Sequence, residues 1–390
     1  MRLAILWVLV LALVVHGQES GDLDSLIKEV FTPAPANNGQ PRVEEGFDEQ
    51  GNPLACQCVP YYLCQNGTIK TDGEGVIDIR IKEPMCESYL DVCCQAPTDT
   101  PIPPSPQPPR LGCGRRNPEG VGFRITGDLD GESQFGEFPW MVAVLRVETV
   151  RPDQPPLNVY QCGGALIHPG VVLTAAHCVF GKDSNVLKIR AGEWDTQTKN
   201  ELYPHQDRGV VKVIVHDQYY AGALYNDVAL LILQSPVDPA DNVDVVCLPE
   251  QGQVFDHSRC FASGWGKNVF GKEGQYQVIL KKVELPVVPR DPCLRALRKT
   301  RLGQHFRLHE SFMCAGGEPG RDTCKGDGGS PLVCPMPDRP GHYAQVGIVA
   351  WGIGCGENGT PGVYANVAKF RHWIDNQFRT NNIESSSYHY

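Results

Sequence analysis

The sixteen cysteines of this 390-residue chain constrain its fold more than any other feature. An even number of cysteines favours a disulfide framework made in an oxidising compartment, and the alternative of a zinc finger lacks histidines at the required spacing. Six of the cysteines fall within 39 residues, a length that buries too little apolar surface to fold without cross-links. We therefore expect a small unit with three disulfides, whose pairing the sequence leaves open. Its cysteines are Cys56, Cys58, Cys64, Cys86, Cys93 and Cys94.

The first residues predict the compartment. Arg2 precedes an apolar run over residues 3–15, and the small residue Gly17 follows it. This order is typical of a secretory signal peptide over residues 1–17, whereas the alternative, a membrane anchor, needs a longer apolar run. We therefore expect a secreted, extracellular protein. Two sequons predict N-glycosylation, at Asn66 and Asn358.

Composition divides the remaining chain into four segments. Residues 18–55 are rich in Gly, Asn, Pro and acidic side chains and are expected to be weakly ordered. The cysteine-rich unit covers residues 56–94, and seven prolines make residues 95–112 a semi-rigid linker. The large segment 113–390 follows, with a core over residues 125–378. The formal net charge of −10 argues against nucleic acid or an anionic membrane as a partner.

Short apolar runs separated by turns fill the large segment. Many short strands with few helix signals predict a mainly β fold, either an antiparallel barrel or a sandwich. One helix is expected near the end of the chain, because Val367, Phe370, Ile374 and Phe378 share one helical face. The expected strands include residues 140–147, 164–174, 210–215, 227–233 and 345–351.

Three short motifs carry the functional signal. His177 follows an apolar strand, Asp227 begins a strongly apolar run, and residues 326–331 form a Gly-rich turn. Each motif alone is more often structural, since such residues commonly make turns or neighbour disulfides. In the order His, Asp, Gly-rich turn, the three resemble the chymotrypsin-like serine protease family. The resemblance covers about residues 125–378 and implies a double antiparallel β-barrel with a C-terminal helix.

The same resemblance implies a pairing for the other ten cysteines. Four pairs would brace the two barrels, and the fifth would tether the segment before the barrels to the large domain. The implied pairs are Cys162 with Cys178, Cys260 with Cys334, Cys293 with Cys314, Cys324 with Cys355, and Cys113 with Cys247.

The Gly-rich turn departs from the family at the residue that matters most. The family pattern is Gly-Asp-Ser-Gly-Gly-Pro, and this chain has Gly-Asp-Gly-Gly-Ser-Pro, which puts Gly328 at the nucleophile position. His177 then has no hydroxyl to deprotonate, and Ser330 lies two residues on, roughly 7 Å away in an extended segment. Loss of such a nucleophile costs about 10⁶ in kcat. We therefore expect a vestigial triad of His177, Asp227 and Gly328 without peptidase activity.

The resemblance assigns further residues. Asp322 is at the position of the acid that gives a trypsin-like pocket its preference for Arg or Lys. Family zymogens are cut before a sequence such as Ile-Val-Gly-Gly. The chain matches this sequence only in part, since Thr126 follows Ile125. Processing is therefore expected in an exposed segment between residues 110 and 124. The candidate cleavage residues are Arg110, Arg115, Arg116 and Arg124.

The loop that begins at Glu193 is a candidate calcium site. Family members that bind calcium use an acid at this position, and Asp195, Thr198 and Glu201 could complete an all-oxygen set. The alternative is a solvated acidic loop that binds nothing.

The cysteine-rich unit, with its adjacent Cys93 and Cys94 and the Pro-rich linker, resembles the clip domain of arthropod haemolymph proteases. That family would pair Cys56 with Cys93, Cys58 with Cys86, and Cys64 with Cys94. The whole chain resembles clip-domain serine protease homologues of the non-catalytic, masquerade-like type, which include prophenoloxidase-activating factors.

This resemblance implies a function. Such proteins are cut by an upstream clip-domain protease and then act as cofactors for prophenoloxidase activation in melanisation, with the clip domain as partner-binding module and a homo-oligomer as the expected product. Two alternatives remain open: an active trypsin-like peptidase that uses Ser330, and a decoy or adhesion protein that needs no processing.

Overall fold

A computed structural model describes the chain in parts. Backbone and side chains are described for residues 112–122, 131–149, 156–197, 201–266, 277–319, 327–353 and 359–390. Backbone alone is described for residues 123–126 and for seven short strands between residues 46 and 94. Within these residues, no helix is long and apolar enough to cross a lipid bilayer.

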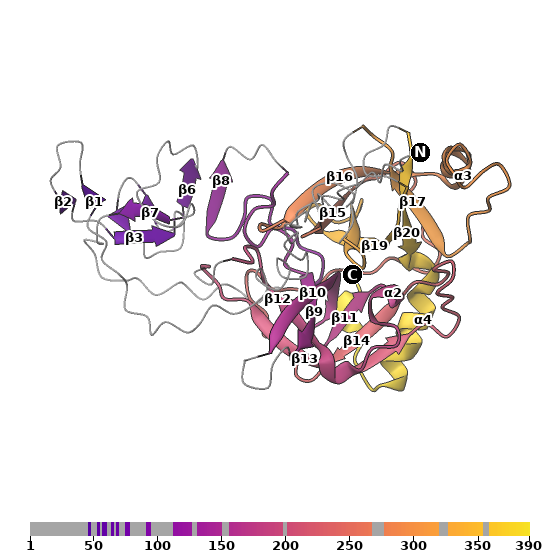
Figure 1. Cartoon of the computed structure of the whole chain (residues 1–390), viewed down its shortest axis with the longest axis horizontal. Coiled ribbons are helices and arrows are strands. Elements are labelled where there is room, and N and C mark those ends of the chain that lie inside the picture. The colour runs from indigo at the N-terminus through magenta and orange to yellow at the C-terminus, as the bar shows by residue number, and fades with distance from the viewer. Residues whose placement is uncertain are drawn as a thin grey trace, which may run out of the picture.

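The large segment folds into two closed antiparallel barrels of six strands each (Figure 1). The expected mainly β, double-barrel fold is confirmed. The first barrel has the order β10-β11-β14-β13-β12-β9, and the second has β15-β16-β17-β20-β19-β18. The first barrel's strands are β9 (Met141–Glu148), β10 (Leu157–His168), β11 (Val171–Thr174), β12 (Leu187–Ala191), β13 (Gln206–Val215) and β14 (Ala229–Leu233). Those of the second are β15 (Arg259–Gly264), β16 (Lys281–Val288), β17 (Phe312–Gly316), β18 (Pro331–Pro335), β19 (Tyr343–Trp351) and β20 (Pro361–Asn366).

The apolar runs become strands because a closed barrel buries their inward side chains and satisfies their backbone groups in the same step. The run expected over residues 164–174 is in fact a hairpin, since the chain turns at Pro169 and Gly170 and Ala165 pairs with Leu173. Proline has no amide hydrogen to donate to a ladder, which explains why the run divides there.

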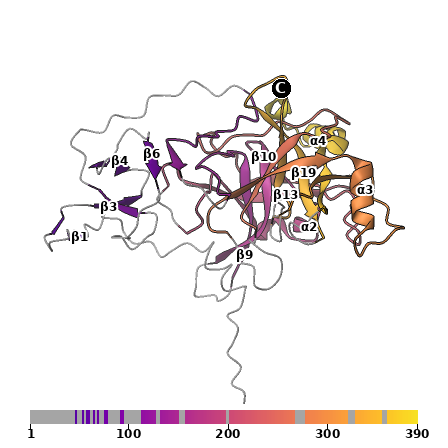
Figure 2. The same cartoon turned by 90° about the horizontal axis from the view of Figure 1, so that it is seen from above.

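Helix α4 (Val367–Thr380) ends the barrels as expected, with Val367, Phe370, Ile374 and Phe378 buried. Two more helices occur among the described residues, α2 (Ala176–Val179) and α3 (Arg290–Arg298), neither of which was predicted from the sequence. Only Cys293 and Leu297 of α3 are buried, so its apolar face is much smaller than that of α4. Figure 2 shows α3 at the outer edge of the barrels.

Four disulfides join the described cysteines: Cys113 to Cys247, Cys162 to Cys178, Cys260 to Cys334, and Cys293 to Cys314. Each is a pair that the family resemblance implied. The expected bond between Cys324 and Cys355 and the three expected in the small unit lie outside the described side chains.

The amino-terminal part contributes short paired strands at the end of the molecule away from the barrels (Figures 1 and 2). Strand β3 (Gln57–Pro60) pairs with β7 (Asp91–Cys94), and β4 (Cys64–Gln65) with β5 (Thr68–Ile69). Strand β6 (Gly75–Asp78) runs parallel to β8 (Phe123–Thr126), which precedes the first barrel. A further pair, β1 (Gly46–Phe47) with β2 (Pro53–Leu54), lies within the segment expected to be weakly ordered.

Candidate functional site

His177 and Asp227 form a hydrogen-bonded pair on the first barrel. His177 lies in α2 directly after β11, and Asp227 precedes β14, so the pairing of these two strands brings them together. The Nδ1 of His177 is 2.6 Å from Oδ2 of Asp227, and the His177 amide donates to Oδ1 at 2.8 Å. Asp227 is fully buried, while 27% of the His177 side chain is exposed. The imidazole is therefore held with Nε2 toward the cleft, 3.6 Å from Sγ of Cys178.

Gly328 lies directly in front of this histidine. A Cβ built on Gly328 would be 2.8 Å from Nε2 of His177. Backbone hydrogen bonds hold the turn around it: the Gly163 amide donates to the Gly328 carbonyl at 2.9 Å, and the Ser330 amide donates to the Asp327 carbonyl at 2.9 Å. The position faces the imidazole as a nucleophile's would, but it carries no side chain.

Ser330 points away from the cleft and into the protein. Only 1% of it is exposed, and its Oγ has no hydrogen-bond partner among the described residues. A Cβ added to Gly163 would be 2.0 Å from this oxygen, and one added to Gly264 would be 3.1 Å away. The hydroxyl is thus enclosed between two glycines, where neither a base nor a substrate reaches it.

The other positions assigned to the cleft are only partly described. Asp322 and Gly326 lie outside the described residues. Oδ1 of Asp327 accepts a hydrogen bond from the Gly266 amide at 2.9 Å. The specificity pocket therefore stays a prediction.

The candidate cleavage residues lie in different environments. Arg115 is exposed, but Arg116 is not, which corrects the expectation that both are. Only 13% of the Arg116 side chain is accessible, because its guanidinium forms an ion pair with Glu137 and lies 3.9 Å from the ring centre of Phe261. Arg124 is in β8, where it is paired with Val76 of β6. Arg110 lies outside the described residues, as do the sequons at Asn66 and Asn358.

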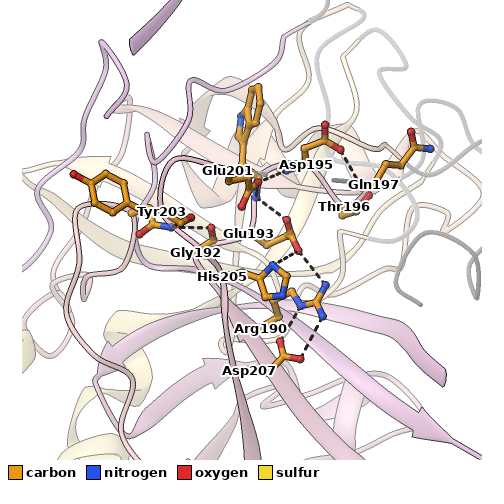
Figure 3. A network of polar contacts seen from close by, with 12 residues as sticks. Arg190, Gly192, Glu193, Asp195, Thr196, Gln197, Glu201, Tyr203, His205 and Asp207 are labelled. Atoms are coloured by element: carbon orange, nitrogen blue, oxygen red, sulfur yellow. Dashed lines mark hydrogen bonds and ion pairs between the residues drawn. The ribbon is translucent and has the colours of Figure 1, made fainter. Parts of the chain in front are cut away.

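The second candidate site is the acidic loop, which we define as residues 192–205 between β12 and β13 (Figure 3). Oε2 of Glu193 is 3.1 Å from Nη1 of Arg190 and 3.2 Å from Nδ1 of His205. Oε1 of Glu201 accepts hydrogen bonds from the amides of Trp194, at 3.0 Å, and Asp195, at 2.8 Å. The loop thus turns its carboxylates inward, toward its own backbone and toward Arg190.

Burial changes the proton affinity of these carboxyl groups. Burial raises the pKa of Glu193 to about 7, against the opposing effect of the Arg190 charge and with a further contribution from Asp195. Burial also raises the pKa of Glu201 well above its usual range, and the nearby Glu193 carboxylate adds to this effect. Negative charge in the acidic loop is therefore unfavourable unless a cation compensates it.

Calcium takes six to eight oxygen ligands, and the described residues fit such a site incompletely. Glu193 and Glu201 converge, but Glu193 already contacts Arg190 and His205, and Oδ1 of Asp195 accepts the Gln197 amide at 2.9 Å. Thr198 lies outside the described residues. Calcium in this loop stays a prediction.

Sequence reasoning missed three residues that shape the acidic loop. Arg190 reaches Glu193 and also Asp207, which is directly opposite it in the β12–β13 pairing. His205 directly precedes β13, and Asn242 comes from a distant turn. Their participation follows from strand register and tertiary contact, for which the sequence shows no local signal.

Two family models match the chain. The model described as Trypsin matches residues 130–374, and the model described as Serine protease Clip domain PPAF-2 matches residues 45–95. The second match begins eleven residues before the first cysteine of the small unit and therefore includes β1 and β2.

Three curated relatives represent the similarity. Phenoloxidase-activating factor 2 of Galleria mellonella is 60% identical over 295 residues, which are 75% of this chain and 97% of the relative. Inactive CLIP domain-containing serine protease A8 of Anopheles gambiae is 38% identical over 89% of this chain and 94% of its own length. Protein masquerade of Drosophila melanogaster is 36% identical over 67% of this chain, but only 24% of that protein is covered.

Proposed function

The chain belongs to the trypsin family of serine proteases and carries a clip domain, and from this premise we propose that it is a secreted, non-catalytic cofactor of prophenoloxidase activation. One observation carries the non-catalytic part. Gly328 faces Nε2 of His177 with no side chain, so the hydrogen-bonded His177–Asp227 pair has nothing to activate. The names of two relatives, a phenoloxidase-activating factor and an inactive clip-domain protease, support the same reading.

The competing peptidase function would require Ser330 as nucleophile. A nucleophile must lie within about 3 Å of its base, and its oxygen must reach the substrate carbonyl. The buried Ser330 Oγ, enclosed by Gly163 and Gly264, meets neither requirement. Active use of Ser330 would need the whole turn to reverse, at the expense of its backbone hydrogen bonds.

Limited proteolysis would switch the cofactor on, and the contact between β6 and β8 supports Arg124–Ile125 as the regulated bond. In the register, Val76 faces Arg124 and Ile77 faces Ile125, so the clip region is hydrogen-bonded to the strand that contains this bond. A protease needs its substrate segment detached from such a ladder. The contact between β6 and β8 would therefore have to open before an upstream clip-domain protease cuts this bond.

The proposed partners follow from this switch. The clip domain, freed from β8, would bind prophenoloxidase or phenoloxidase, and the cleaved chain would form a homo-oligomer. Haemolymph would be the place of action, after removal of a signal peptide over residues 1–17.

A fluorophosphonate probe tests the non-catalytic part. The full chain is cleaved, its new amino terminus is sequenced, and the product is incubated with the probe beside active trypsin. We expect no labelling of the chain and full labelling of trypsin. Labelled Ser330, lost in Ser330→Ala, would overturn the proposal.

A reconstituted melanisation assay tests the cofactor part. Prophenoloxidase and its activating protease are combined with the cleaved chain, with the uncleaved chain, or with Arg124→Gln, and phenoloxidase activity and particle size are measured. We expect stimulation and a larger particle from the cleaved chain only. Full stimulation by Arg124→Gln, with sequencing that shows no cut elsewhere, would favour a decoy or adhesion protein that needs no processing.

A further inference from the structure

The acidic loop gathers three side chains of metal-binding type that do not take part in the proposed function. The ligand atoms of Glu193, Glu201 and His205 all lie within 4.8 Å of one another. Glu193 lies two residues after β12 and His205 directly before β13, so the pairing of the two strands sets the distance between these two residues. Figure 3 shows Arg190 and His205 directed at the same carboxyl group of Glu193.

One oxygen in this group has nothing to bind. Oε1 of Glu201 accepts two backbone amides, whereas its Oε2 is buried and accepts no hydrogen bond from any residue that the structure describes. A buried carboxylate oxygen without a partner is unfavourable, and proteins usually compensate such an oxygen with a donor or a metal ion. The oxygen therefore points to a missing cation.

The surroundings hold the group in place. The buried Asn242 donates through Nδ2 to the carbonyls of Gly192, at 3.0 Å, and Tyr203, at 3.1 Å, which joins the two ends of the loop. Arg190 holds Asp207 with two hydrogen bonds, from Nε at 2.8 Å and from Nη2 at 3.3 Å. If Glu193 binds another cation, Arg190 therefore still has Asp207 as an ion-pair partner.

We propose that Glu193, Glu201 and His205 bind a transition-metal ion of the Zn²⁺ class. The imidazole decides the class, because zinc favours mixed nitrogen and oxygen ligands in a set of about four, whereas calcium takes oxygen ligands only. This set differs from the all-oxygen set expected from the sequence, since it includes His205 and leaves out Thr198.

The present spacing suits such an ion. Ligand atoms about 2.1 Å from a tetrahedral zinc ion are about 3.4 Å from one another. Oε2 of Glu193 and Nδ1 of His205 are 3.2 Å apart. The carboxyl group of Glu201 needs to move by little more than an ångström to complete the set, and its Oε2 has no hydrogen bond to lose.

Calorimetric titration of the full chain, stripped of metal with a chelator, tests the proposal. Zinc chloride and calcium chloride are titrated separately, and zinc is then titrated in the presence of millimolar calcium. We expect one zinc ion per chain and no competition by calcium. His205→Asn should weaken zinc binding by about 100-fold or more, because it removes a direct ligand.

The matched control is His305→Asn, which alters an exposed histidine outside the loop and should leave zinc binding unchanged. Circular dichroism of every variant checks that the barrels are folded. Substitution by Co²⁺ gives a second readout, since a tetrahedral nitrogen and oxygen set produces strong visible absorption that His205→Asn should abolish. Equal zinc affinity in His205→Asn, or displacement of zinc by calcium, would overturn the proposal.

Discussion

The cleft between His177 and Gly328 and the acidic loop between β12 and β13 treat polar groups in opposite ways. In the cleft, backbone hydrogen bonds to Gly163 and Val349 hold the Gly328 turn, and none of them depends on a side chain at position 328. In the acidic loop, carboxyl groups are buried beyond what Arg190 and His205 compensate, and an oxygen of Glu201 is left without a partner. A catalytic activity can thus be lost with one side chain while the backbone around it keeps its hydrogen bonds. A binding site, in contrast, requires several polar groups to stay buried although water would solvate them better.

The largest expected effect concerns the cleft. Gly328→Ser should restore little activity, because its Cβ would lie 2.8 Å from Nε2 of His177 and would displace the imidazole from its present alignment with Asp227. We expect kcat/KM on an arginyl ester, measured after processing, to stay at least about 10³-fold below that of trypsin, or about 4 kcal/mol in barrier. Gly328→Ala provides the background rate. Activity within tenfold of trypsin would show that the cleft lacks only its hydroxyl.

The next effect tests how tightly Ser330 is enclosed. Gly163→Ala should lower the free energy of unfolding by about 3 kcal/mol, because the new methyl group would lie 2.0 Å from Ser330 Oγ. Denaturant unfolding monitored by tryptophan fluorescence measures the loss. Addition of Ser330→Gly should restore part of the stability, and a double variant no more stable than Gly163→Ala would mean that another contact is responsible.

A smaller loss is expected in the acidic loop. Asn242→Ala removes two hydrogen bonds to the carbonyls of Gly192 and Tyr203 and should cost about 2 kcal/mol in unfolding free energy. The matched control, Asn185→Ala, removes only the exposed hydrogen bond from Nδ2 to Oδ1 of Asp183 and should change stability by less than about 0.5 kcal/mol. A similar change in unfolding free energy for the two substitutions would show that the hydrogen bonds of Asn242 contribute no more to stability than those of an exposed turn.

The smallest effect has the opposite sign. Ser330→Ala should raise the free energy of unfolding by about 1 kcal/mol, since it removes a buried hydroxyl that has no partner among the described residues. Thermal unfolding of this variant is compared with that of Ser386→Ala, an exposed position. Destabilisation by Ser330→Ala would indicate that the hydroxyl makes a contact that matters.

The sequence predicted the barrels and α4 because their signal is local. Val367, Phe370, Ile374 and Phe378 form a stripe that any helix would bury, and apolar runs bounded by turns become strands in a closed barrel. Helix α3 escaped prediction because only two of its nine residues are buried.

The sites show the same limit. His177, Asp227 and Gly328 were found through motifs, since each has a distinctive neighbourhood in the sequence. Arg116 was expected to be exposed because a charged residue beside a linker usually is, but stacking on Phe261 and pairing with Glu137 bury it. His205 lies near Glu193 because β12 pairs with β13 in a particular register. That register depends on both strands, so it could not be predicted from either segment alone.

Because Cys113 is disulfide-bonded to Cys247, the position of the cut decides whether the clip domain stays attached to the barrels. A cut after Arg115 or Arg124 leaves Cys113 on the amino-terminal fragment, so the clip domain remains attached to the barrels as the light chain of a two-chain molecule. A cut after Arg110 falls before Cys113 and sets the clip domain loose. One gel, run with and without reductant, therefore distinguishes a tethered adaptor from a shed one.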